Sequence, residues 1–71
     1  MRDVILKSEP VELYKILKFE GLVHSGGAAK MVIDSGEVYV NGEVETRKRK
    51  KIVAGDVIEF NGEKIRMVLA G

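Results

Sequence analysis

The sequence has no cysteine and no tryptophan, and it contains only one proline and one histidine. Without a thiol, the chain forms no disulfide, thiolate zinc site, iron–sulfur cluster or cysteine nucleophile. Long apolar runs are also missing: the longest, Met67 to Ala70, has four residues, whereas a membrane-spanning helix needs about 20. The N-terminal residues show no signal-peptide pattern, so we expect a cytoplasmic protein.

The 71 residues suffice for one small domain, which we expect to occupy residues 1–71. Hydrophobic residues make up 45% of the chain and the formal net charge is only +1, a composition that argues against disorder. A chain of this length buries about 60% of its unfolded surface, so its core is small. The fold therefore depends on the packing of that core or on oligomerisation.

Apolar spacing in the first half of the chain predicts two helices. The stretch from Ser8 to Pro10 has the composition of a helix start, with proline in the first turn. The apolar stripe that follows consists of Leu13, Ile16 and Leu17. Gly21 is a natural stop for this helix. Ser25 can cap a second helix, which ends at Ser35–Gly36.

The second half of the chain changes to the period of two that β-strands show. Val38 and Val40 alternate with Glu37 and Tyr39, and a similar alternation of apolar and polar residues follows over residues 57–69. The Asn-Gly pairs at 41–42 and 61–62 are strong hairpin signals. A short strand over residues 3–7 can join the same sheet. The sequence therefore predicts an α+β fold with two helices packed on a small, mostly antiparallel sheet.

A run of five cations follows Thr46, and we name it the basic segment. It consists of Arg47, Lys48, Arg49, Lys50 and Lys51. Five adjacent like charges repel one another and cannot be buried without partners; if the run is extended, its side chains alternate between two sides. At least one side then faces solvent or a polyanion, and bound phosphates would relieve the repulsion. Because no acidic residue is interleaved, we favour anion binding over a merely solvated loop.

The remaining charges do not make the chain basic. Outside the basic segment, 7 basic residues face 11 acidic ones. Lys15 and Lys18 lie on the outer face of the first helix, and Lys30 lies in the second. Each alone is most simply a solvated charge, so these lysines extend the basic segment only if all three elements share one face of the molecule.

The turn before the second helix, His24-Ser25-Gly26-Gly27, is a weaker candidate for a phosphate site. Amides at a helix N-terminus are free to bind a phosphate, and Gly26 and Gly27 would let one approach closely. An ordinary serine cap explains the same residues and is the commoner arrangement. The spacing of a Walker loop is absent, and His24 and Ser25 lack the orienting carboxylate that a hydrolase needs.

The aromatic residues bear on how a nucleic acid would be recognised. They are Tyr14, Phe19, Tyr39 and Phe60. We expect Phe19 and Phe60 in the core and Tyr39 at the surface, because Tyr39 points away from the flanking valines. Since no pair of aromatic residues forms a stacking platform, an RNA would be recognised by its phosphates and shape more than by its bases.

An ordered series of residues resembles a known family. The series is Gly21-Leu22, Ser25 with Ala29, Val32-Ile33, Gly36, Val38, Val40-Asn41-Gly42, Gly55-Asp56 and Ile58. It is similar to the S-four-type RNA-binding domain, also called the alpha-L motif, over most of the chain. The stretch from Val44 to Arg49, followed by Lys51 to Gly55, looks like the small stand-alone YbcJ-like members of that family.

The resemblance implies an RNA-binding surface formed by the two helices and a basic loop. By position, this surface would contain Ser25, Lys30 and the basic segment. Many members have arginine after the capping serine, where this chain has Gly26, and begin the first helix with Arg-Leu-Asp, where this chain has Glu12-Leu13-Tyr14. We therefore expect the basic segment to supply most of the attraction. The family implies a module without catalysis or cofactor that binds structured ribosomal or transfer RNA, with a role in ribosome assembly or translation.

Two other classes remain open. A ubiquitin-like sulfur carrier has a similar V-N-G…G-D-x-I run, but it needs a mobile Gly-Gly end, and this chain ends Ala70–Gly71. A protein-interaction module would dock the basic segment on an acidic partner, with Tyr39 as an anchor. An enzyme is the least favoured class, because the sequence shows no metal cluster, catalytic triad or paired catalytic carboxylates.

Overall fold

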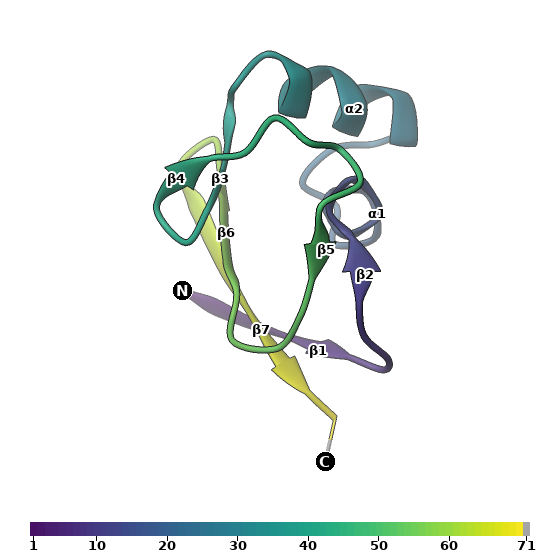
Figure 1. Cartoon of the computed structure of the whole chain (residues 1–71), viewed down its shortest axis with the longest axis vertical. Helices are drawn as coiled ribbons and strands as arrows, with labels where there is room; N and C mark the ends of the chain where they lie inside the picture. Colours follow the sequence, from purple (N-terminus) through teal and green to yellow (C-terminus); the bar gives the residue numbers. More distant parts are fainter. Residues whose placement is uncertain (71) are drawn as a thin grey trace.

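Apolar alternation in the second half of the chain builds the main sheet of the computed structural model, which describes residues 1–70. The helices are α1 (Leu13–Phe19) and α2 (Gly26–Asp34). The strands are β1 (Arg2–Leu6), β2 (Val11–Glu12), β3 (Val38–Val40), β4 (Glu43–Val44), β5 (Lys51–Ile52), β6 (Val57–Phe60) and β7 (Glu63–Leu69). Five strands form a sheet in the order β1-β7-β6-β3-β4, while β2 and β5 pair separately beside α1 (Figure 1). Gly71, on which the sulfur-carrier alternative depends, lies outside the described residues.

The pairing of the strands confirms the expected small, mostly antiparallel sheet. The initial strand joins it as predicted: β1 runs parallel to β7, with Val4 opposite Met67, whereas the other pairs of the sheet are antiparallel. Both predicted hairpin turns are present. The φ angles are 53° and 85° in the Asn41–Gly42 turn and 53° and 81° in the Asn61–Gly62 turn. Two successive positive φ angles are typical of the type I′ turn, whose twist matches that of the flanking strands.

The apolar core lies between the inner face of the sheet and the two helices. In β3, Val38 and Val40 are buried and Tyr39 between them is exposed, as the alternation predicts. Phe60 is partly buried against this core. The buried hydrophobic residues are Val4, Leu6, Leu13, Ile16, Leu17, Ala29, Ile33, Val38, Val40, Ile52, Ile58, Ile65 and Met67. Within residues 1–70, neither helix has the length and apolar character needed to cross a membrane.

The second helix begins and ends where the sequence predicts. The Ser25 side chain caps α2, because its Oγ accepts a hydrogen bond of 3.0 Å from the amide of Ala28. Gly36 follows the last turn with a φ of 77°, a left-handed conformation that stops the helix. Ala29 and Ile33 lie on the buried face.

The predicted start of the first helix is wrong. Helix α1 begins at Leu13, not within the stretch from Ser8 to Pro10, and Val11–Glu12 forms the short strand β2. The cause is distant in sequence: Val11 pairs with Ile52 and Glu12 with Lys51, so these two residues are held extended until the helix begins. The predicted apolar stripe of α1 is nevertheless buried, and the helix ends before Gly21, which has a φ of 73°.

The expected burial of Phe19 is also wrong, because its side chain is 67% exposed. Phe19 follows Leu17 by two residues, which places it about 200° around the helix from that buried side chain. Phe19 also follows Ile16 by three residues, so it lies at the edge of the buried stripe, where it lines a surface recess with Ile16 and Val11. The hydrophobicity of one residue did not decide its burial; its angular position on the helix did.

We predict opposite effects for two glycine-to-alanine substitutions. Gly62→Ala should lower the free energy of unfolding by about 1 kcal/mol, because an L-residue is strained at the φ of 81° in this turn. Gly26→Ala should not lower it, because Gly26 is helical and a Cβ there would meet no heavy atom within 4 Å. Urea denaturation followed by circular dichroism measures both. Equal destabilisation by the two substitutions would contradict the assigned turn.

Candidate nucleic-acid interface

A hydrogen-bonded clamp closes the base of the loop that carries the basic segment. The Asn41 side chain accepts from the amide of Val57 at 2.9 Å and donates to the Asp56 carboxylate at 3.0 Å. The other oxygen of Asp56 accepts from the amide of Val53 at 3.0 Å. The two ends of the segment between β3 and β6 are therefore tied together, which shortens the free length of the loop between them.

The middle of this loop is bonded to the start of α1. The amide of Leu13 donates to the carbonyl of Lys50 at 2.9 Å, and the amide of Tyr14 donates to the carbonyl of Lys48 at 3.1 Å. The first amides of a helix have no acceptor within the helix, so the loop backbone supplies acceptors that the helix lacks. Strands β2 and β5 continue the contact beside it.

The basic segment is consequently folded into a turn. Lys50 donates its amide to the carbonyl of Arg47 at 3.1 Å, and only Lys51 lies in a strand. The side chains of the basic segment therefore do not alternate between two sides, as they would in an extended segment. Because the carbonyls turn inward to α1, the side chains are directed outward: Lys50 is half-exposed and the other four residues are exposed. Four of the five residues line one shallow recess, namely Arg47, Arg49, Lys50 and Lys51.

Carboxylates accompany the two arginines of the segment in space, although none is interleaved in sequence. Glu45 receives two hydrogen bonds from the Arg47 guanidinium, at 2.9 and 3.1 Å, and one from its amide at 3.0 Å. Glu12 lies 3.8 Å from Arg49 and 3.5 Å from Lys15. Within residues 1–70, Lys48, Lys50 and Lys51 have no ion-pair partner.

Tyr14 brings the helix lysines to the same face as the basic segment. The Lys30 Nζ lies 4.8 Å from the centroid of the Tyr14 ring, and the Lys15 Nζ lies 6.0 Å from it. The amide of Tyr14 is bonded to the carbonyl of Lys48. Lys15 lines one surface recess with Lys51, so Lys15 lies beside the loop, and Lys30 contacts the same tyrosine. Lys18 follows Tyr14 by four residues, on the same side of α1. Sequence analysis missed Tyr14, although its spacing from Lys18 was a signal.

The start of α2 provides uncovered backbone amides and no further charged side chain. Ser25 is engaged as the cap, and its Oγ is already bonded to Ala28. The amides of Gly26 and Gly27 are the first two of the helix and have no acceptor within it. A Cβ at Gly26 would meet nothing within 4 Å, and one at Gly27 would meet only the Ser25 Oγ at 4.0 Å. Lys30 follows about one turn later.

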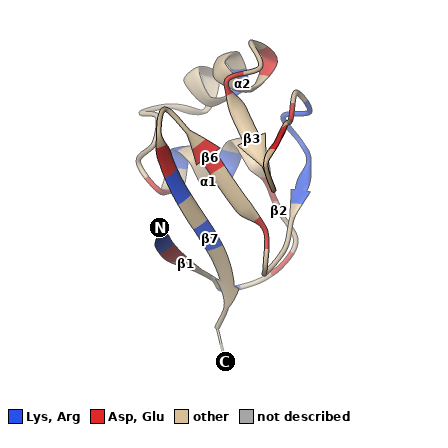
Figure 2. Cartoon of the chain, turned by 90° about the vertical axis from the view of Figure 1, so that its left-hand side faces the viewer, with Lys and Arg blue, Asp and Glu red and all other residues tan. Residues whose placement is uncertain are grey.

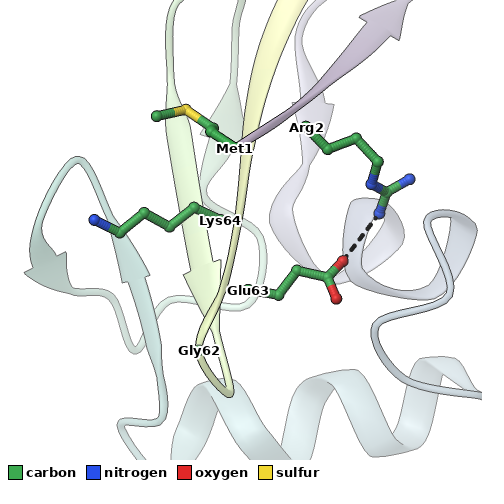
Figure 3. Close-up of a pocket in the computed structure, with 5 residues that line it drawn as sticks. All are labelled: Met1, Arg2, Gly62, Glu63 and Lys64. Atoms are coloured by element: carbon green, nitrogen blue, oxygen red, sulfur yellow. Dashed lines mark hydrogen bonds and ion pairs between the residues drawn. The ribbon is translucent and has the colours of Figure 1, made fainter.

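Other charged areas of the molecule are internally balanced. Figure 2 shows positive and negative residues mixed along β6 and β7, whereas blue dominates the loop that contains the basic segment. On the sheet, Arg66 pairs with Asp3 at 3.1 Å. A second recess near the N-terminus contains Arg2, whose guanidinium lies 3.2 Å from the Glu63 carboxylate (Figure 3). The Glu20 carboxylate lies at the same distance from this guanidinium. The two arginines outside the basic segment are therefore paired with carboxylates, and the adjacent lysines without an ion-pair partner in residues 1–70 lie in the loop.

The fold, the contact of the basic segment with α1 and a comparison with known families together define the class of the protein. The model of the S4 domain family matches residues 4–68, so the chain belongs to the S4 domain family. This confirms the resemblance identified in the sequence and extends it to the flanking strands β1 and β7.

Particular relatives are similar over most of their length. "Putative RNA-binding protein YbcJ" of Escherichia coli (strain K12) is 50% identical over 62 residues, which cover 87% of this chain and 89% of that protein. "Probable ribosome maturation protein RlbA" of Bacillus subtilis (strain 168) is 36% identical over 59 residues, or 83% of each chain. The solution structure of YbcJ from E. coli, described as revealing an alpha-L motif involved in RNA binding, is 46% identical. It superposes with a TM-score of 0.72, covering 96% of this chain and 87% of that one.

We predict that the Glu45 carboxyl titrates below its ordinary pKa, because the Arg47 side chain donates hydrogen bonds to the carboxylate. A pKa lowered by folding contributes stability above the unfolded value of about 4.3, and this contribution is lost as the pH falls through the folded pKa. Carboxyl resonances followed by NMR against pH measure it. Arg47→Met should raise the Glu45 pKa and Arg49→Met should leave it unchanged, since Arg49 contacts Glu12. An Arg47→Met protein with an unaltered Glu45 pKa would contradict the prediction.

Proposed function

We propose that this chain is an RNA-binding module that recognises structured RNA mainly through phosphate contacts. The observation that carries the proposal is the common face formed by the basic segment and the helix lysines, joined through Tyr14. Three lysines of that segment have no ion-pair partner within residues 1–70, so phosphates need not displace a carboxylate to reach them. Membership of the S4 domain family and similarity to a relative named as RNA-binding support the proposal.

The proposed contacts position an RNA backbone and do not read base edges. The exposed aromatic side chains lie elsewhere: Phe19 lines a recess with residues of β1, and Tyr39 lies on the sheet face opposite the core. The cationic face contains the half-buried Tyr14. Lysine ammonium groups act as point charges toward phosphates, and the amides of Gly26 and Gly27 add donors for a phosphate oxygen. A surface of this kind favours the shape of a folded RNA.

We further propose that the module acts without catalysis and that its RNA is ribosomal or transfer RNA, in ribosome assembly or translation. The relative from B. subtilis is named as a ribosome maturation protein and shares 36% identity with this chain. The S4 domain match supports a binding role for residues 4–68. Ribosomal particles supply the dense phosphate backbone that the cationic face would contact.

We predict that two matched pairs of lysine substitutions will differ in RNA binding. Lys48→Gln with Lys51→Gln should weaken binding and reduce the slope of log affinity against log salt by about 1.4 to 1.8, since each lost phosphate contact accounts for about 0.7 to 0.9. Lys7→Gln with Lys64→Gln removes the same charge from exposed lysines elsewhere and should leave the slope unchanged. Filter binding to a folded ribosomal RNA fragment measures both. Equal slopes for the two double variants would contradict the proposed interface.

We also predict that the protein co-sediments with ribosomal particles at low salt and is released at high salt, because the attraction is electrostatic. The Lys48→Gln, Lys51→Gln variant should remain in the supernatant, and the Lys7→Gln, Lys64→Gln control should sediment. Absence of the wild-type protein from the particle fraction would contradict the ribosomal assignment. A partner retained after nuclease treatment would instead favour the protein-interaction module.

A further inference from the structure

One aromatic residue contacts all three elements of the proposed interface, the loop through its backbone amide and the helix lysines through its ring. Tyr14 belongs to α1, its ring lies 4.8 Å from the ammonium nitrogen of Lys30 on α2, and its amide is bonded to Lys48 in the basic segment. The ring is partly buried and packs against the apolar core, so its position is fixed by that packing. The Lys15 ammonium lies on the same ring at the longer distance of 6.0 Å.

A fixed ring of this kind restrains a flexible cation. The face of an aromatic ring is electronegative and attracts an ammonium group within about 6 Å of its centroid. Free lysine side chains sample many rotamers, which they lose on binding a ligand. A lysine already held over a ring loses fewer of them. The ammonium has three N–H donors, so those directed away from the ring remain available to a phosphate.

We propose that Tyr14 is a positioning residue of the interface, whose ring holds the Lys30 ammonium beside the basic segment for contact with an RNA phosphate; this inference rests on the proposed RNA-binding function. Tyr14 itself need not touch the RNA. Its ring makes α2 part of the same cationic surface as the loop, although Lys30 and the basic segment are about 20 residues apart in the chain.

The experiment is a double-mutant cycle between Tyr14 and Lys30, measured as RNA affinity. Tyr14→Leu should weaken binding roughly twofold to fivefold, the change expected when an exposed cation–π contact that prepares a cation is lost. Tyr14→Phe keeps the ring face and should bind like the wild type. In a Lys30→Met background, Tyr14→Leu should cause a smaller further loss, because the nearer cation is gone and only Lys15, 6.0 Å from the ring centroid, remains over the ring. Tyr39→Leu on the outer sheet face is the matched control and should bind normally.

A spectroscopic measurement on the RNA-free protein separates positioning from general structure. The ring current of Tyr14 should shift the Lys30 ε-protons upfield in the wild type and in Tyr14→Phe, and the shift should vanish in Tyr14→Leu. Should Tyr14→Leu fail to fold, Lys30→Met and Lys30→Arg provide the test. Loss of affinity in Lys30→Met with retention in Lys30→Arg is expected, because a guanidinium also binds the face of a ring.

Failure of this inference differs from failure of the proposed function. Wild-type binding that weakens in Lys48→Gln, Lys51→Gln but not in Tyr14→Leu would overturn the role of Tyr14 and leave the interface intact. Independent, additive losses from Tyr14→Leu and Lys30→Met would overturn it as well, as would unchanged affinity in Lys30→Met. No RNA binding by the wild type would overturn both proposals.

Discussion

The two hydrogen bonds between the first amides of α1 and the carbonyls of Lys48 and Lys50 are the constraint on which the interface depends. They satisfy donors that a helix cannot satisfy itself, and they fold the basic segment into a turn with its carbonyls inward. The same contact places five cations at the positive end of a helix dipole, which adds to the local positive potential. Main-chain acceptors and nearby carboxylates make such a concentration of positive charge tolerable in the free protein.

Those carboxylates divide the basic segment into two kinds of residue. Glu45 and Glu12 lie against Arg47 and Arg49, and arginine suits such contacts because its planar fork of donors matches a carboxylate. The lysines are left without acidic partners within residues 1–70. The arginine contacts therefore shape the loop, and the lysines supply the charge that remains available. The count of five cations overstates the number that a phosphate can engage without competition.

The departure from the family pattern at the start of the first helix has a physical meaning in this arrangement. Many S4 domains begin the first helix with Arg-Leu-Asp, where this chain has Glu12-Leu13-Tyr14. Glu12 contacts Arg49 of the loop, Tyr14 contacts Lys30 of α2, and both contact Lys15 of α1, so the residues at these positions meet cations from all three elements. The chain thus concentrates positive charge on the same face without an arginine at the start of α1. Leu13, which matches the leucine of the family pattern, is buried in the core.

Local chemistry decided much of the fold, so the sequence alone determined the two Asn-Gly turns, the Ser25 cap, the alternation of the strands and the family. The turns, the cap and the alternation each depend on residues within a few positions of one another, and the family on an ordered series of such local features from Gly21 to Ile58. The start of α1, the turn in the basic segment, the ion pair of Arg49 with Glu12 and the contact of Lys30 with Tyr14 were decided only by the tertiary structure. They join groups from 16 to 41 positions apart, as in the contact of Lys30 with Tyr14 and the pairing of Val11 with Ile52. No periodicity along the chain encodes such pairings, because they form only when packing of the core has brought the elements together.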